Sequence, residues 1–409
     1  MKHIQAFLTP SFAGNIPRFF VFRALYNFML FLPVWVIFLQ RDHGLSLTQV
    51  TFVDFAFWIT MAVTEVPTGA VADTLGRKLS NLIGVGLTAV SLLLFGLTPD
   101  YALLLVANSL WAVAMTFISG ADLALFYDTL RTLGREDQYQ LYRGRLQAVT
   151  LISIAVSSGL GGLLGAYNLR ATFTITAAVL AVAFVVVLLL KEPPREPDRE
   201  TGKHLGYLGT LRITWQTILR LPGLRYALLY SNLVPLVGSA IQATFIQPYA
   251  VEVGLPIVIL GIVSLGLRLF QIAGSTYSTR LVRFFGEWRW LLIAPLFEIG
   301  GVLALGGVNG PWGILVFAVG GLAGSATTPL VESLILRQTP GNIRATILSV
   351  DSLVFRLMLA GIGPLLGILG DRAGIPYAFV AAAGGTGFLV LLTLLFWMRL
   401  KPPLPAVNE

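Results

Sequence analysis

The chain has 409 residues, of which 56% are hydrophobic and 12% charged, and its formal net charge is +8. Soluble globular domains carry about twice that share of charged residues, so this composition excludes an ordinary soluble domain and favours a membrane protein. Cysteine is absent and there are three histidines, all in expected loops, so we expect no disulfide, no metal site and no cofactor.

Long apolar runs follow one another along the whole sequence. A helix crosses the hydrocarbon layer with about 20 residues, and only helices or closed barrels satisfy their backbone hydrogen bonds there. The runs are continuous rather than alternating, which favours helices over strands. The sequence therefore predicts an all-α membrane protein with twelve transmembrane helices. They are expected at 18–40, 49–72, 78–97, 101–127, 141–166, 171–190, 224–250, 256–281, 288–308, 311–334, 345–370 and 375–398.

Basic residues gather on one side of the expected membrane. The loops of that side, with both termini, hold 22 of the 28 Lys and Arg residues, whereas the opposite loops hold Arg41, Arg170 and Arg372. Because basic loops stay on the cytoplasmic side, we expect a multi-pass cell-membrane protein with both termini in the cytoplasm. The positive charge thus reflects topology, and no nucleic-acid partner is expected.

The segment 191–223 is the one long break between apolar runs. It begins with charged and Pro-rich residues, and its second half has the spacing of an amphipathic helix on the inner membrane surface. This break predicts an N-terminal bundle of six helices at 1–190, a cytoplasmic linker at 191–223 and a C-terminal bundle at 224–409. Gly69 and Gly274 lie 205 residues apart at matching places, as in an internal repeat with pseudo-two-fold symmetry.

The turn between the second and third helices is the most specific motif. It combines glycines, an Asp and two adjacent basic residues, namely Gly69, Asp73, Gly76, Arg77 and Lys78. In this place the turn resembles the signature of the major facilitator superfamily (MFS), although Thr74 replaces a residue that is usually basic there. The resemblance implies a transporter that works by alternating access.

Three short stretches at and after the end of the fourth helix resemble a bacterial subgroup of that family. They are 119–122, 124–128 and 133–135. The subgroup is mostly assigned to the export of drugs or small metabolites, so the resemblance implies the same kind of cargo.

The turn also has a physical meaning of its own. Asp73 precedes a helix N-terminus, whose dipole favours an anion, and the two glycines permit close backbone approach. Asp128 is a candidate second partner of Arg77. The resemblance implies a latch that steadies the outward-facing state, formed by Gly69, Asp73, Gly76, Arg77, Lys78 and Asp128; the alternative is a loop that only sets topology.

Ionisable residues inside the membrane are costly and point to function. Asp54 is the first candidate for proton coupling, although a shallow residue hydrated from outside is the alternative. Glu65 is a second candidate, which could instead serve the latch. Arg268 and Arg356 are candidates for contacting an anionic substrate, or for ion pairs with Glu298 or Asp351.

Polar, aromatic and Met side chains on several helices are candidates for the substrate cavity, because such side chains adapt to amphipathic ligands. With the two arginines, the expected cavity residues are Asn27, Asn108, Trp111, Met115, Asn232, Gln242, Arg268, Gln271, Thr328 and Arg356.

The sequence leaves two transport functions open. One is proton-coupled export of a small amphipathic compound, of the multidrug type. The alternative is uptake or facilitated transport of an anionic metabolite through Arg268 and Arg356. Ser157 and Ser158 stand where drug–proton antiporters of the family carry Gly-Pro, which weakens the case for proton-coupled export. No metal-ligand spacing, phosphate loop or nucleophile elbow is found, so we expect no enzyme. The expected partners are a small molecule, protons and the bilayer, with a monomeric chain.

Overall fold

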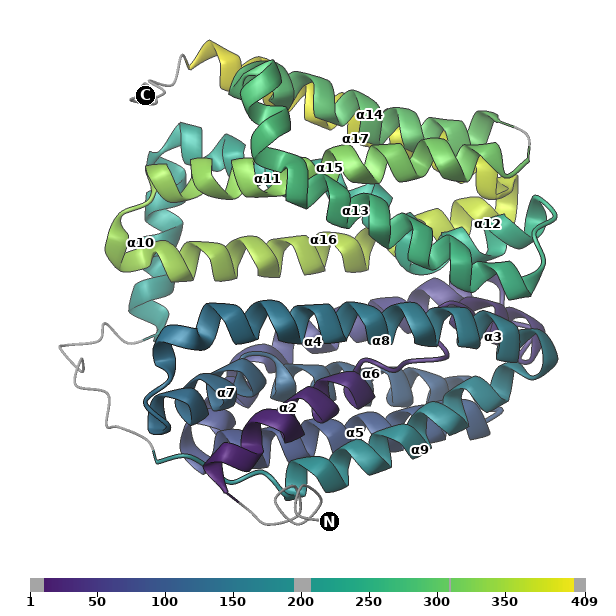
Figure 1. Cartoon of the computed structure of the whole chain (residues 1–409). Helices are drawn as coiled ribbons and strands as arrows, with labels where there is room; N and C mark the ends of the chain where they lie inside the picture. The colour runs from purple at the N-terminus through teal and green to yellow at the C-terminus, as the bar shows by residue number, and fades with distance from the viewer. Residues whose placement is uncertain (1–10, 195–206, 309, 401–409) are drawn as a thin grey trace. The chain divides into compact units, whose positions relative to one another are not determined.

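The computed structural model describes residues 11–194, 207–308 and 310–400, which form helices joined by short turns (Figure 1). Eleven helices in this part of the chain are long and apolar enough to cross a membrane. The chain divides into two compact units. Unit 1 contains Met1–Asp198 and Leu255–Leu265, and unit 2 contains Arg199–Gly254 and Gly266–Glu409. The expected all-α membrane fold is confirmed.

Unit 1 holds the helices drawn from purple to blue in Figure 1. Helix α5 packs against α6 and α9, α4 packs against α6, and α2 packs against α7, α8 and α9. The helices are α2 (Phe12–Tyr26), α3 (Trp35–Arg41), α4 (Leu47–Leu75), α5 (Arg77–Leu97), α6 (Tyr101–Ile118), α7 (Ala121–Thr132), α8 (Tyr139–Tyr167) and α9 (Leu169–Leu188).

The first expected helix, 18–40, is not continuous. It is divided into α2 and α3 by the turns of residues 27–34. Pro33 lacks a backbone N–H, and its ring disfavours a helical conformation in the preceding residue. The N–H of Leu30, which has no helical partner in these turns, donates to Oγ1 of Thr176 on α9 at 3.1 Å. Irregular backbone is tolerated inside a membrane protein where protein groups satisfy it, as they do here.

The fourth expected helix, 101–127, is also divided. It ends at Ile118 and resumes at Ala121 as α7, because Gly120 has φ of 80°, in a region that favours glycine. The first turn of α7 places the buried carboxylate of Asp122 in an ion pair with Arg23 of α2. This pair ties the two divided helices together.

Small residues let α8 approach the first turns of α13 (Ile257–Phe285). These turns, up to Leu265, belong to unit 1. A Cβ on Gly162 would lie 2.6 Å from the carbonyl oxygen of Val258, and a Cβ on Gly261 would overlap the carbonyl oxygen of Ser158. Only glycine allows backbones this close. The Ser- and Gly-rich stretch of α8 therefore has a packing role in this unit.

Unit 2 holds the helices drawn from teal through green to yellow in Figure 1, apart from the turns at 257–265. Helix α14 packs against α15 and α17, and α11 packs against α15, α16 and α17. The helices are α10 (Tyr207–Arg220), α11 (Pro222–Ala240), α12 (Ile246–Glu252), α13 (Ile257–Phe285), α14 (Glu287–Gly307), α15 (Trp312–Gln338), α16 (Arg344–Ala373) and α17 (Ile375–Arg399).

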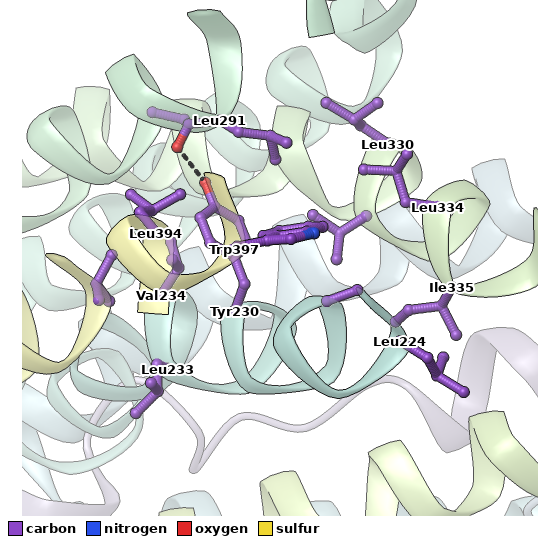
Figure 2. Close-up of a cluster of buried hydrophobic side chains, with 14 of the residues drawn as sticks. Leu224, Tyr230, Leu233, Val234, Leu291, Leu330, Leu334, Ile335, Leu394 and Trp397 are labelled. Carbon is purple, nitrogen blue, oxygen red and sulfur yellow. Dashed lines mark hydrogen bonds between the residues drawn. The ribbon is translucent and has the colours of Figure 1, made fainter. Parts of the chain in front are cut away.

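A cluster of buried apolar side chains joins α11, α14, α15 and α17 (Figure 2). Trp397 and Tyr230 are the largest of its members that are almost completely buried. The hydroxyl of Tyr230 donates to the carbonyl oxygen of Leu291 at 2.8 Å, and Nε1 of Trp290 donates to Oγ1 of Thr327 at 3.1 Å. The polar ends of Tyr230 and Trp290 are therefore engaged between helices, whereas Nε1 of Trp397 has no hydrogen-bond partner among the described residues.

Helices α14 and α15 touch through their backbones. A Cβ on Gly320 would lie 2.7 Å from the carbonyl oxygen of Phe297, and one on Gly301 would lie 3.0 Å from the Cα of Phe317. Such contacts between small residues are the usual means of close helix packing in membranes. They fix α14 beside the cavity described next.

Candidate functional site

Unit 2 contains a cavity of about 470 Å³. That volume suits a small organic molecule. Side chains from α11, α13, α14, α15 and α16 surround it, with a mixture of aromatic, aliphatic, amide, hydroxyl and carboxylate groups. Its polar lining residues are Tyr230, Ser231, Asn232, Ser239, Gln242, Gln271, Glu298, Ser325, Thr327, Thr328, Glu332, Asp351 and Ser352.

A π-helical turn, Ile241–Phe245, interrupts the helix that begins as α11. Such turns add a residue to the helix and are frequent at functional sites. Gln242 lies in this turn and lines the cavity. Its Oε1 accepts a hydrogen bond of 2.6 Å from Nε2 of Gln271 on α13. The two amides therefore form a polar bridge along one side of the cavity.

Asp351 of α16 is a half-buried carboxylate with two hydrogen-bond donors. Its Oδ1 accepts hydrogen bonds from Oγ of Ser231 at 2.8 Å and from Nδ2 of Asn232 at 2.6 Å. Donors at these distances stabilise the ionised form of a carboxylate. The side chain of Asp351 is thus equipped to carry a negative charge at the cavity wall.

Glu298 of α14 has the opposite surroundings. The residue is 7% exposed, lines the cavity, and its Oε2 has no hydrogen-bond partner in the described parts of the chain. With Glu332 and Asp351 it brings three carboxyl groups to one cavity whose lining contains no Lys, Arg or His. This set of charges favours a cation over an anion.

Four of the ten expected cavity residues line this cavity: Asn232, Gln242, Gln271 and Thr328. Arg268 and Arg356 are not among the lining residues, although Leu267 and Phe355 beside them are. Arg268 is exposed and Arg356 is half-buried. The cavity of unit 2 therefore offers no guanidinium group to an anionic ligand.

The other expected cavity residues lie in unit 1. Nδ2 of Asn27 donates to the carbonyl oxygen of Arg23 at 2.8 Å, at the end of α2. Nδ2 of Asn108 donates to the carbonyl oxygen of Val53 at 2.8 Å and so joins α6 to α4. Trp111 and Met115 pack on the small apolar cluster of Phe57, Met61 and Ala112. Both Asn side chains thus satisfy backbone groups.

The two expected proton-coupling residues lie on α4 and are half-buried. Oδ2 of Asp54 accepts a hydrogen bond of 3.1 Å from Nε1 of Trp58, one turn later on the same helix. Glu65 lies three turns further along α4, in the stretch that ends with Pro67. The two carboxyl groups are therefore at separate depths of one helix.

The expected latch is assembled in part. Arg77 forms an ion pair with Asp128 of α7, in a partly buried position. Gly76 has φ of 124°, so a glycine is required where α4 ends and α5 begins. The anion at the N-terminus of α5 is Glu192, which accepts hydrogen bonds from the backbone N–H groups of Arg77 and Lys78.

Two parts of the latch expectation have a different outcome. A Cβ on Gly69 would meet no described atom within 4 Å, so the close backbone approach expected there is absent. The side chain of Asp73 lies outside what the structure describes. Glu192, rather than Asp73, is therefore the residue seen at the α5 N-terminus.

Sequence reasoning missed several groups of the site. Asp351 and Glu298 were expected only as partners of arginines, and the lining hydroxyls Ser231 and Thr327 were not expected at all. The available signal was the set of carboxylates at 298, 332 and 351, one on each of three successive helices. Glu192 also had a signal, because it lies two residues after Leu190, where the sixth apolar run ends.

Comparison with known proteins gives one family and a consistent set of relatives. The family model of the Major Facilitator Superfamily matches residues 19–317. Multidrug resistance protein 1 of Bacillus subtilis (strain 168) is 28% identical over 192 residues, or 46% of this chain and 48% of that protein. Multidrug resistance protein MdtG of Escherichia fergusonii is 25% identical over 386 residues, or 91% of this chain and 90% of that protein.

Solved structures with the same fold include transporters of different cargo. A bacterial homologue of the human lysosomal transporter Spinster has a TM-score of 0.76 at 16% identity, covering 96% of this chain and 98% of that one. A D-xylose–proton symporter has a TM-score of 0.70 at 13% identity, covering 94% and 96%. With the family model matching most of its length, the chain belongs to the Major Facilitator Superfamily and is a multi-pass membrane transporter, not an enzyme.

Proposed function

We propose that the protein exports small amphipathic compounds from the cell in exchange for protons. The observation that carries this proposal is the cavity of unit 2, in which apolar and aromatic side chains surround three carboxyl groups and no basic one. Aromatic and aliphatic walls suit an amphipathic body, and the carboxyl groups suit either a proton or a positively charged ligand group.

The multidrug names of the two relatives support export, since one of them covers nine-tenths of this chain. The alternative, uptake of an anion through Arg268 and Arg356, receives no support from the cavity, because neither residue lines it. Proton coupling through Asp54 or Glu65 and a latch at Arg77 belong to the same proposal, as do cytoplasmic termini and a monomeric chain.

The direction of transport is tested in cells that produce the protein, with a fluorescent amphipathic cation such as ethidium. Under export, collapse of the proton gradient by an uncoupler raises ethidium accumulation to the level of cells without the protein. Under uptake, the same treatment lowers accumulation or leaves it unchanged, and that result would overturn the proposal.

The coupling residue is tested with Asp54→Asn in liposomes. If Asp54 carries the transported proton, this variant binds ethidium but no longer moves it in response to a pH gradient. Gradient-driven flux equal to that of the unchanged protein would remove Asp54 from the mechanism. Phe52→Ala, at an exposed position one half-turn away on α4, is the control and leaves flux unchanged.

A further inference from the structure

Glu298 is a carboxyl group that the family signature does not explain. It lies near the middle of α14, is 7% exposed, and faces the cavity of unit 2. Its Oε2 is buried and has no hydrogen-bond partner among the residues that the structure describes. A buried carboxyl oxygen in this state is unusual, because buried polar atoms nearly always have partners.

Two glycines create the space for this carboxyl group. A Cβ on Gly238 of α11 would lie 2.5 Å from Oε1, and a Cβ on Gly324 of α15 would overlap Oε2. The group is thus enclosed between two helix backbones whose own N–H groups are used within the helices. No other residue type at these two positions would leave room for Glu298 in its present orientation.

The hydroxyl groups near this space are already engaged. Tyr230 donates its one hydroxyl hydrogen to Leu291, and Thr327 donates to the carbonyl oxygen of Ala323 at 2.8 Å. Neither is therefore free to donate to Glu298. Oε2 of Glu298 therefore lacks a donor that would stabilise an ionised carboxylate.

The titratable groups that line the cavity bring no positive charge. Tyr230 faces the cavity from α11, Glu332 from α15 and Asp351 from α16. Arg268 of α13 and Arg356 of α16 are not lining residues. The titratable residues of α17 are Tyr377, which is exposed near its start, and Arg399 at its last turn. An ionised Glu298 would therefore add a third negative charge to a lining without Lys, Arg or His.

An isolated buried carboxylate is strongly unfavourable unless a proton or a cation neutralises it. We propose that Glu298 binds the exchangeable proton of unit 2 and releases it when an organic cation enters the cavity. The O–H bond of the carboxylic acid breaks, the proton passes to water in the cavity, and the carboxylate that remains is paired with the cation. One positive charge leaves for each one that enters.

This inference rests on the proposed export of amphipathic compounds and adds the residue that exchanges charge. Asp351 provides the matched comparison, since it lines the same cavity but has donors in Ser231 and Asn232. We therefore assign the exchange in this cavity to Glu298 rather than to Asp351.

The proton on Glu298 is tested without any substrate. Infrared spectra of the purified protein in lipid contain the C=O stretch of a protonated carboxylic acid at neutral pH. Glu298→Gln removes that band, whereas Asp351→Asn retains it. A band of unchanged intensity in Glu298→Gln would overturn the assignment of the proton.

A second variant covers the case in which Glu298→Gln does not fold. Gly324→Ala retains Glu298 but occupies its space, so the acid band shifts or disappears. Gly300→Ala on α14, where a Cβ meets open space, is the control and leaves the band in place. Identical acid bands in Gly324→Ala and Gly300→Ala would contradict the assignment of the protonated group to Glu298.

The exchange is tested with tetraphenylphosphonium as the probe cation. Binding to the purified protein in weakly buffered solution releases about one proton per cation bound, and Glu298→Gln abolishes the release. Equal release from Glu298→Gln would overturn the exchange. If the unchanged protein binds no tetraphenylphosphonium, cation exchange and the proposed cargo both fail, while the infrared band still decides where the proton lies.

Discussion

Glu192 holds the N-terminus of α5 through the backbone of Arg77. Its Oε1 accepts the N–H of Arg77 at 2.9 Å and its Oε2 accepts the N–H of Lys78 at 2.7 Å. A helix N-terminus leaves its first N–H groups unpaired and carries partial positive charge, so a carboxylate at this place is stabilising. Glu192, just after α9, is therefore hydrogen-bonded to the first residues of α5.

Replacement of this carboxylate should destabilise unit 1. Glu192→Ala leaves both N–H groups without their acceptor, and removal of a side-chain cap costs about 0.5–2 kcal/mol. Thermal unfolding of the purified protein measures the loss. Glu136→Ala is the control, since Glu136 is exposed and 3.8 Å from Arg131, and its effect should be near zero. Equal melting temperatures for the two variants would contradict the role of Glu192.

Arg77 and Asp128 should show energetic coupling. Both side chains are partly buried, with 28% and 19% of their surface exposed. Residues in direct contact couple by about 0.5–3 kcal/mol, so Arg77→Ala, Asp128→Asn and the double variant should not be additive in unfolding free energy. Additive losses would show that the ion pair is inconsequential for stability.

The latch proposal has its own readout. If the ion pair of Arg77 steadies one transport state, Arg77→Ala should change the inward/outward balance, measured as spectroscopic distances across the cytoplasmic helix ends. Distances unchanged from the original protein would leave the turn with a structural role alone.

Hydropathy was sufficient to predict the class and most of the spans, since, in the described parts of the chain, eleven of the twelve expected segments contain a helix long enough to cross a membrane. Apolar runs of about 20 residues have few alternatives in a membrane, so most expected segments have a matching helix. The divisions of the first and fourth helices were not predictable in this way. They depend on Thr176 accepting a contact from Leu30 and on the positive φ of Gly120, and neither feature changes the hydropathy of its segment.

The cavity was predictable only in part, for a different reason. Asn232, Gln242, Gln271 and Thr328 were polar residues in apolar helices, which is a signal that sequence carries. The place of Glu298 depends instead on two glycines in other helices, Gly238 and Gly324. Sequence position does not reveal which backbones meet, so this carboxyl group was expected to have a structural role.

Helix packing in unit 2 should be sensitive to volume at Gly320. Its Cβ would lie 2.7 Å from the carbonyl oxygen of Phe297 and 3.2 Å from the Cα of Glu298, and these are backbone atoms that cannot rotate away. Gly320→Ala should therefore separate α14 from α15 and cost about 1–3 kcal/mol.

The control for this prediction is Gly300→Ala, which introduces the same methyl group on α14 into open space. Because alanine favours helices over glycine, this variant should be neutral or stabilising by up to about 1 kcal/mol. Thermal unfolding compares the two, and a loss in Gly300→Ala as large as in Gly320→Ala would point to an effect of the methyl group unrelated to packing.

His43 should make unit 1 sensitive to acid. It lies in the loop before α4, half-buried, with its ring 4.7 Å from that of Phe38, and its Nε2 has no partner among described residues. Burial lowers the pKa of His43, an effect that Arg170 reinforces and the charge of Asp42 opposes. An unfolded chain therefore takes up this proton at a higher pH than the folded one.

Stability is lost wherever the unfolded state binds more protons, so the contribution of His43 is present above about pH 6.5 and declines as the pH falls below it. His43→Leu should make the melting temperature less dependent on pH across that acid range. Asp42→Asn removes the opposing charge and should strengthen the decline and extend it to lower pH. Melting curves of His43→Leu that run parallel to those of the unchanged protein from pH 7 to pH 5 would exclude His43 as the source of the sensitivity.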